Sequence, residues 1–107
     1  MAINFTPADI NVNTTRTLAY TGPTGKVGII FSGVIANIDD TNKQDRFVTV
    51  EIQRTDNSYV KVFNKLVVPY GNSLALPKIV VMPDEKLYFT GDAASVLQAR
   101  LSIAERS

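Results

Sequence analysis

The stretch Val48-Thr49-Val50-Glu51-Ile52-Gln53 alternates apolar and polar side chains without a break. Because successive side chains of a strand point to opposite faces, this pattern predicts a half-buried antiparallel strand with its polar side chains in water. Residues 54–57, Arg-Thr-Asp-Asn, have the composition of a turn. Residues 58–63 then return with Val60 and Val62 inward, so we expect a β-hairpin.

Other extended segments lie on both sides of this hairpin, separated by turns rich in Gly, Pro, Asn and Asp. They are residues 10–20, 26–38, 66–68, 73–76, 79–82, 86–90 and 96–104. β-Branched residues account for 31 of the 107 residues, and they fit a pleated sheet better than a helix. We therefore predict an all-β fold of eight or nine short strands, an antiparallel β-sandwich of jelly-roll type, with a small barrel as the alternative.

Two segments have patterns that leave alternatives open. Residues 96–104 alternate strictly, which favours a strand over the helix that their Ala, Leu, Gln and Arg content would also allow. Residues 26–38 are apolar at both alternations, so this strand is covered twice, either by the core and another sheet or by a neighbouring subunit. Gly33 is a candidate β-bulge within it.

The first twelve residues predict an N-terminal arm, and residues 13–107 a single sandwich domain. In the first twelve residues the apolar side chains are spaced apart and interrupted by Pro7, which suits a segment laid on another subunit or on a capsid surface. The chain begins with no basic region followed by an apolar stretch, so we expect no signal peptide. The most apolar run, residues 27–38, is too short to span a bilayer.

Composition excludes several classes of chemistry. The chain contains no Cys, His or Trp, which removes disulfides, thiolate chemistry, Cys/His zinc sites and imidazole catalysis. A net charge of +1 gives no field that would attract nucleic acid or an anionic membrane. We therefore expect no nucleic-acid partner, no membrane partner and no cofactor.

No motif in the sequence predicts a catalytic or metal site. The acidic loop of residues 39–45 contains Lys43 and lacks the pattern of an EF-hand, so its Asp and Asn side chains are interpreted as turn formers rather than calcium ligands. Residues 21–26 do not match a phosphate loop, because the glycine spacing is wrong and a strand follows. No Ser lies in a nucleophile motif, and we expect no enzyme.

Aromatic residues of the hairpin suggest a surface for interaction. Phe47, Tyr59 and Phe63 lie on the alternation opposite the inward Val residues, with Arg54 and Lys61 nearby. Such a face could stack single-stranded bases, but burial or contact with another protein explains it better, since an acidic residue shares the face. A carbohydrate platform is a further alternative, for which the available rings are Tyr20, Tyr59, Tyr70 and Tyr88.

The second half of the chain resembles small virion proteins of tailed bacteriophages. The resemblance is carried by residues 67–74, 76–81, 84–92 and 96–105, which contain a proline-glycine turn, short strands and a final alternating strand. The sequence departs from the family where Pro83-Asp84-Glu85 stands in place of the usual Gly-Asp. The resemblance implies a β-sandwich that assembles on a capsid or tail, commonly as a trimer or within a larger ring.

Together these observations predict a non-enzymatic virion structural protein, most simply a capsid cement or decoration protein. The first alternative is a head–tail connector or tail accessory protein, and the second is a carbohydrate-binding host-attachment module. The expected partners are further copies of the chain, as a trimer, and the major capsid or another virion protein, and the expected location is the virion, assembled in the host cytoplasm. The candidate interface residues are Ile3, Phe5, Ile10, Val12, Ile29, Phe31, Ile35, Phe47, Tyr59 and Phe63.

Overall fold

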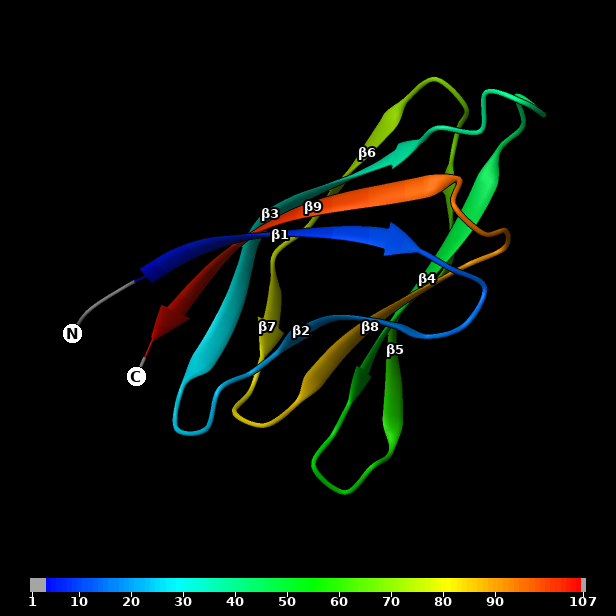
Figure 1. The fold of residues 1–107 in the computed structure, drawn as a ribbon. Helices are drawn as coiled ribbons and strands as arrows, with labels where there is room; N and C mark the ends of the chain where they lie inside the picture. Colours follow the sequence, from blue (N-terminus) through cyan, green and yellow to red (C-terminus); the bar gives the residue numbers. More distant parts are fainter. Residues whose placement is uncertain (1–3, 107) are drawn as a thin grey trace.

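The computed structural model describes residues 4–106, which form nine strands in two antiparallel sheets (Figure 1). The strands are β1 (Asn4–Val12), β2 (Thr17–Thr21), β3 (Val27–Asn37), β4 (Arg46–Gln53), β5 (Tyr59–Val68), β6 (Ser73–Leu76), β7 (Ile79–Val81), β8 (Lys86–Gly91) and β9 (Leu97–Arg106). Within these residues no helix is long and apolar enough to cross a membrane.

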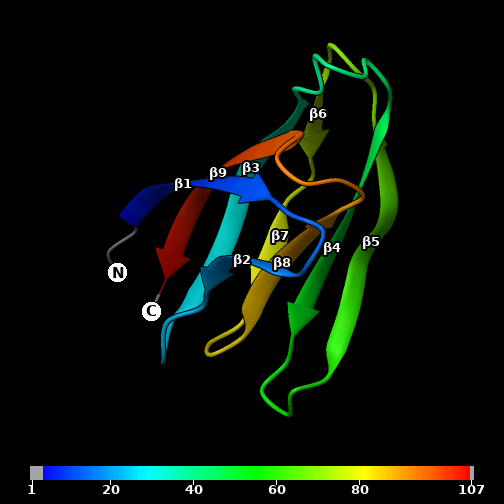
Figure 2. The same cartoon turned by 45° about the vertical axis from the view of Figure 1, so that its right-hand side comes forward.

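The strand order is that of a jelly roll. The first sheet runs β1-β9-β3-β6, with β7 also paired to β3, and the second sheet runs β2-β8-β4-β5. Most links cross from one sheet to the other, so the two sheets lie face to face, as Figure 2 shows. The strand at the far edge of the first sheet, beyond β3, is divided into β6 and β7 around Pro77. Proline has no N–H and therefore cannot donate a hydrogen bond to β3 at this point. The predicted sandwich is confirmed.

The core lies between the sheets and is built from alternate residues. In β9 the side chains of Leu97, Ala99, Leu101 and Ile103 are buried. The side chains that alternate with them, Gln98, Arg100 and Ser102, are exposed. This segment is the strand that its alternation predicted, and it is central to its sheet because it pairs with both β1 and β3. Burial of apolar side chains such as these is the main favourable contribution to folding.

A β-bulge in β3 changes which of its residues face the core. Ile30 lies opposite Ile103 and Ser32 opposite Ser102, so Phe31 is an extra residue in β3. The phase of the strand changes there: Ile30 is buried before the bulge, and Gly33 and Ile35 after it. The bulge is therefore at Phe31 and not at Gly33, where the sequence suggested it.

The predicted N-terminal arm is wrong for the described residues. Asn4–Val12 is β1, which pairs with β9 along its whole length and belongs to the sandwich. Sequence reasoning treated Pro7 as an interruption, but proline is accepted in an edge strand when its missing N–H faces away from the neighbour. β1 is such an edge.

The hairpin of β4 and β5 is confirmed, but Phe63, which the alternation places outward, faces the core. A register shift between Val50 and Glu51 places Phe63 opposite the buried Val50. Glu51 lies on the outer face, as expected, but it is buried there in its pair with Arg16, and Val60, expected inward, is 45% exposed. Asn57 has a φ of 69° in the turn, where Asn is one of the few side chains that tolerate a left-handed backbone.

Candidate interaction surfaces

Four of the ten candidate interface residues face the interior of this chain. Ile10, Val12 and Ile35 are buried in the core, so in this structure they are not available to a partner. Phe63 is half-buried and packs against the same core. Alternation alone does not separate these residues from surface residues, because the spaced apolar residues of β1 also suit an arm and β3 and β5 contain register shifts.

The exposed candidates divide between the two outer faces of the sandwich. Ile29 and Phe31 lie on β3 in the first sheet, half-buried and exposed respectively. Phe47 and Tyr59 lie on β4 and β5 in the second sheet, and both are exposed. The backbone of Phe5 pairs with Ala104 in β1, whereas Ile3 lies outside the described residues.

The outer face of the first sheet is apolar over β3 and β7. Phe31 is 58% exposed, Val34 46%, Val80 46% and the adjoining Met82 50%. Ile29 pairs with Val80 across the two strands, which places both side chains on this face. The Lys78 ammonium lies 5.9 Å from the centroid of the Phe31 ring, within the range of a cation–π contact. We call Ile29, Phe31, Val34, Val80 and Met82 the first-sheet patch.

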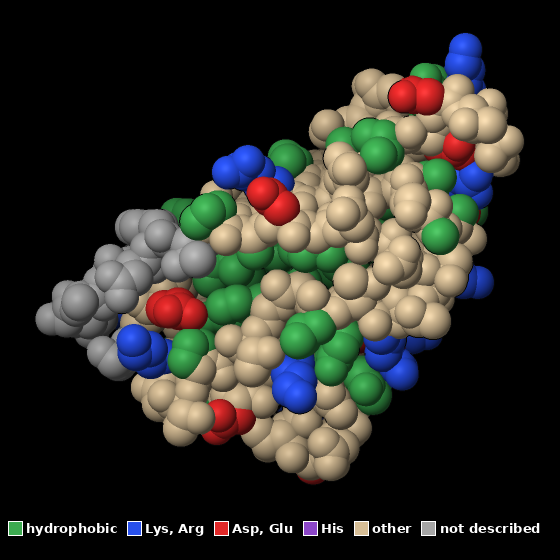
Figure 3. All heavy atoms as spheres, in the orientation of Figure 1, with side chains coloured by type: hydrophobic (Ala, Val, Ile, Leu, Met, Phe, Trp, Pro, Cys, Tyr) green, Lys and Arg blue, Asp and Glu red, His purple; other side chains and the backbone are tan. Residues whose placement is uncertain are grey.

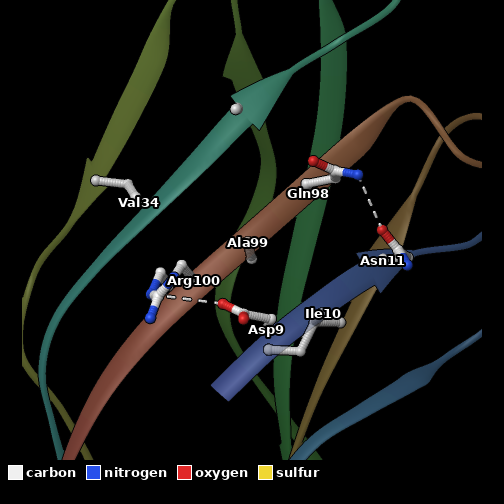
Figure 4. A pocket seen from close by; sticks show the side chains of 8 residues that line it. Asp9, Ile10, Asn11, Val34, Gln98, Ala99 and Arg100 are labelled. Atoms are coloured by element: carbon white, nitrogen blue, oxygen red, sulfur yellow. Dashed lines mark hydrogen bonds and ion pairs between the residues drawn. The ribbon is translucent and has the colours of Figure 1, made fainter. Parts of the chain in front are cut away.

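A shallow hollow of about 410 Å³ adjoins this patch across β1, β9 and β3 (Figure 4). The Nε of Arg100 lies 3.6 Å from Oδ1 of Asp9 across the strands. Nε2 of Gln98 donates to Oδ1 of Asn11 at 3.2 Å, in the next cross-strand pair on the same face. Both pairs are exposed, so the hollow offers charged and amide groups beside an apolar patch.

Unpaired strand edges lie on both sides of the sandwich. β1 and β2 end the two sheets on one side, and Figure 3 shows hydrophobic side chains in the gap between them. The partly buried Ala8 and Ala19, from these two strands, pack against the core there. An edge strand is a template for pairing with another chain, but Pro7 removes one donor from the β1 edge.

The outer face of the second sheet contains a cluster of polar and aromatic side chains. Nε and Nη2 of Arg16 donate to the two carboxylate oxygens of Glu51 at 3.2 and 3.3 Å. This hydrogen bond raises the pKa of Arg16, so the guanidinium stays charged. The guanidinium lies 3.6 Å from the centroid of the Tyr59 ring, and Tyr59 lies 6.0 Å from the ring of Tyr88. The hydroxyl of Tyr88 donates to Oε1 of Gln53 at 3.3 Å.

A second hollow, of about 370 Å³, lies on the same sheet near the ends of β4 and β8. It is lined by Phe47, Thr49, Lys65, Thr90, Gly91 and Asp92. Thr49 and Thr90 are cross-strand neighbours. The hydroxyl of Thr90 is buried, and it has no hydrogen-bond partner among residues 4–106.

The acidic loop before β4 is held by ion pairs and local hydrogen bonds. Nε of Arg46 donates to Oδ2 of Asp39 at 2.9 Å, and the N–H of Asn42 donates to Oδ1 at 3.2 Å. Burial alone would raise the pKa of Asp39, but the hydrogen bonds from Arg46 and Asn42 outweigh it and hold that pKa below its usual value. In the described part of the chain no three acidic side chains gather into a metal-binding group.

Two of the four tyrosines proposed for a carbohydrate platform are tied to carboxylates. The hydroxyl of Tyr20 donates to Glu105 at 2.6 Å, and burial together with this hydrogen bond raises the pKa of Tyr20. The hydroxyl of Tyr70 donates to Asp40 at 2.8 Å, which raises the pKa of Tyr70. Tyr59 and Tyr88 are the two that come together on one face.

Sequence reasoning missed Arg16, Lys65 and Thr90. Arg16 precedes β2 and reaches Glu51 from 35 residues away, so no local pattern links them. Lys65 has a left-handed backbone, with a φ of 54°, at an irregularity between β4 and β5. Such a φ is rare for Lys, and only the turn-like Asn64 before it gives a hint in the sequence.

No family model matches the chain, and no curated protein sequence matches it. Among solved structures, a protein of the Bacillus endospore appendages, described as a family of disulfide-linked pili, aligns with a TM-score of 0.62. The alignment has 17% identity and covers 99% of this chain and 87% of the other. At this identity the likeness shows the fold, a small β-sandwich. The CBM22-1 xylan-binding domain of Paenibacillus barcinonensis Xyn10C aligns with a TM-score of 0.45 and 17% identity over 80% of this chain and 57% of that one, too weakly to carry an argument.

Proposed function

We propose that the chain is a non-enzymatic structural subunit that binds its neighbours in a repeating assembly through the first-sheet patch. The observation that carries this proposal is the exposure of Phe31, Val34, Val80 and Met82 on one sheet face. An antiparallel sheet that faces water normally presents polar side chains there. Exposed apolar side chains gathered on one sheet face are typical of a surface that another protein covers.

The proposed occupant of this patch is a further copy of the chain. The Asp9–Arg100 pair beside the patch provides one acidic and one basic side chain. In a contact between two copies, Asp9 of one copy can pair with Arg100 of the other, so that no unpaired charge is buried. The molecule measures 46 × 27 × 17 Å, and its broad face is large enough for the typical 800 Å² or so per partner. We propose a trimer as the assembled unit.

We further propose that this unit is a cement or decoration protein on the capsid of a tailed phage, in contact with the major capsid protein. The resemblance of residues 67–105 to small virion proteins supports this location, and jelly rolls recur in viral capsid proteins. The pilus likeness supports a subunit of a repeating structure, but that pilus is disulfide-linked and this sequence has no Cys. A head–tail connector or tail accessory protein is the alternative within the virion.

Heating capsids with and without the bound protein tests the cement role. Contacts made only in the assembled shell stabilise it by mass action, so coated capsids should be disrupted at a higher temperature, by an amount that grows with protein concentration. A protein that binds without raising the disruption temperature would retain a structural role but lose the cement assignment. A protein that fails to bind capsids, and binds purified necks or tails, would support the alternative.

A carbohydrate-binding host-attachment module is the second candidate, because the second sheet presents a different kind of surface. Tyr59 and Tyr88 lie beside Arg16 and Gln53, and this grouping combines ring surface with hydrogen-bonding groups. Binding of the isolated protein to a glycan array, with loss of binding in Tyr88→Ala, would favour this function over a purely structural one.

A further inference from the structure

A trimer of the kind proposed above requires two different contact surfaces on each copy. A threefold axis joins unlike surfaces, and so does an open stack, whereas contact between two first-sheet patches joins like surfaces and ends at a dimer. The first-sheet patch therefore needs a second surface of the chain to receive it. The exchange of Asp9 and Arg100 also fits a ring, because each copy then gives Asp9 to one neighbour and Arg100 to the other.

Phe31 is the most prominent side chain of the first-sheet patch. It is the extra residue of the β3 bulge, and its exposure of 58% is the highest among the large hydrophobic side chains that the structure describes. The ammonium of Lys78 lies 5.9 Å from the centroid of its ring, so a cation accompanies the apolar ring. A receiving surface must therefore offer an apolar hollow with a carboxylate at its rim.

The hollow on the second sheet has a lining and a size that suit such a ring. β4 lies between β8 and β5, and its outward Phe47 lines the hollow between Lys65 of β5 and Asp92, which follows β8. Phe47 and its cross-strand neighbour Val67 are each 42% exposed, so apolar surface borders the hollow. An apolar cavity of about 150 Å³ holds one benzene ring, and this hollow measures about 370 Å³. It therefore has room for the ring of Phe31.

Asp92, the carboxylate at the rim of the hollow, is only partly neutralised by its own chain. Its Oδ2 lies 3.7 Å from Nη1 of Arg46, while Nε of the same guanidinium donates to Oδ2 of Asp39 at 2.9 Å. One guanidinium thus faces two carboxylates, and the side chain of Asp92 is 30% exposed. Asp92 can therefore accept a further cation, which the Lys78 ammonium beside Phe31 provides.

From these observations we infer that Phe31 of one copy inserts into the hollow beside Phe47 of the next copy, where Lys78 of the first copy pairs with Asp92 of the second. The contact joins the outer face of the first sheet to the outer face of the second sheet. The two phenyl rings meet in an offset or edge-to-face arrangement, which aromatic pairs favour. The inference rests on the proposed self-association and adds the surface that receives the first-sheet patch.

Two variants that each lack one half of the contact test this arrangement. Phe31→Ser lacks the inserted ring but keeps the hollow, whereas Phe47→Ser keeps Phe31 but lacks one wall of the hollow. In sedimentation velocity, each variant alone should associate at least about tenfold more weakly than the wild-type chain. An equimolar mixture should form a dimer of unlike chains and no larger species, because one intact contact joins the two chains and the surfaces left over are both altered.

A double-mutant cycle tests the pairing of Lys78 with Asp92. Lys78→Gln and Asp92→Asn should each weaken association by about two- to fivefold. The chain that carries both substitutions should associate about as strongly as either single variant, because both substitutions remove the same interaction. Losses that multiply in the double variant would overturn the pairing.

Leu18→Ser is the control on the same sheet, because Leu18 is 50% exposed on β2 and lies outside the hollow, so this variant should associate normally. Thermal unfolding checks the fold of every variant. If Phe47→Ser does not fold, Lys65→Gly replaces it, because it removes another wall of the hollow and glycine accepts the φ of 54° at that position.

The failure of this inference and the failure of the proposed function give different results. Normal association of a folded Phe47→Ser variant, with weak association of Phe31→Ser, would overturn the inference and leave contact between two first-sheet patches. A mixture of the two variants that stays monomeric would also overturn the inference. A wild-type chain that stays monomeric up to millimolar concentration would overturn the proposed self-association itself.

Discussion

Replacing Phe31 with Ser should weaken self-association without weakening the fold. Phe31 is 58% exposed in the single chain. A Phe side chain presents about 200 Å², so roughly 115 Å² remains for a partner to cover. At about 25 cal/mol per Å² this area contributes up to about 3 kcal/mol per contact, an association constant up to about 150-fold higher.

Sedimentation velocity over a hundredfold range of concentration measures this effect. The wild-type chain should shift from monomer to a larger species, and Phe31→Ser should make that shift only at far higher concentration. Leu18→Ser is the matched control, because Leu18 is 50% exposed but lies on the second sheet. Thermal unfolding of both variants should stay close to that of the wild type at low concentration. A Phe31→Ser variant that associates as strongly as the wild type would refute the role of the first-sheet patch.

Three further predictions concern the fold. Leu101→Ala should lower the free energy of unfolding by about 2 to 5 kcal/mol in urea titration, because it empties a fully buried position, whereas the outward Arg100→Ala should change it by less than about 1 kcal/mol. Gly28→Ala should destabilise the fold by about 1 to 3 kcal/mol, because the new Cβ would clash with the Tyr20 ring, and Tyr fluorescence should report the displaced ring. The pKa of Asp39 is lowered in the folded state. The stability that this carboxylate contributes is therefore present above its unfolded pKa of about 3.9 and is lost as the pH falls through the lower folded value. In Asp39→Asn the free energy of unfolding should therefore change less steeply with pH in this acid range.

The fold could be predicted where local pattern and burial agree. In β9 every second side chain of the first seven residues is buried, which strict alternation had indicated. The turns around Gly25 and Asn57 were marked by residue types that accept a positive φ, and both positions have one. Strand existence and the sandwich class followed from these signals.

The errors arose where a register shift separates sequence position from side-chain direction. A bulge at Phe31 reverses the phase of β3, and a register shift between β4 and β5 places Phe63, and not Val62, opposite the buried Val50. A one-residue slip moves every later side chain to the other face, and no local composition reveals it. Pro7 misled for another reason, since an edge strand tolerates the residue that a central strand rejects.

The candidate surfaces were less predictable than the fold, because they are assembled from distant segments. Phe47 and Tyr59 were found as exposed aromatic residues of one hairpin. The guanidinium of Arg16 that covers Tyr59, and the unpartnered hydroxyl of Thr90, come from elsewhere in the chain. Such pairings depend on strand order, which alternation does not specify.

The bulge in β3 has a consequence for how sequences of this fold can vary. Since Ile30 and Ser32 oppose consecutive residues of β9, excising Phe31 would leave a regular ladder with Ile30, Gly33 and Ile35 all still inward. Descendants of this sequence could therefore gain or lose the aromatic ring by a single-codon insertion or deletion while the interior stays intact. Adhesion of the outer surface would then evolve independently of folding, at one point in the chain.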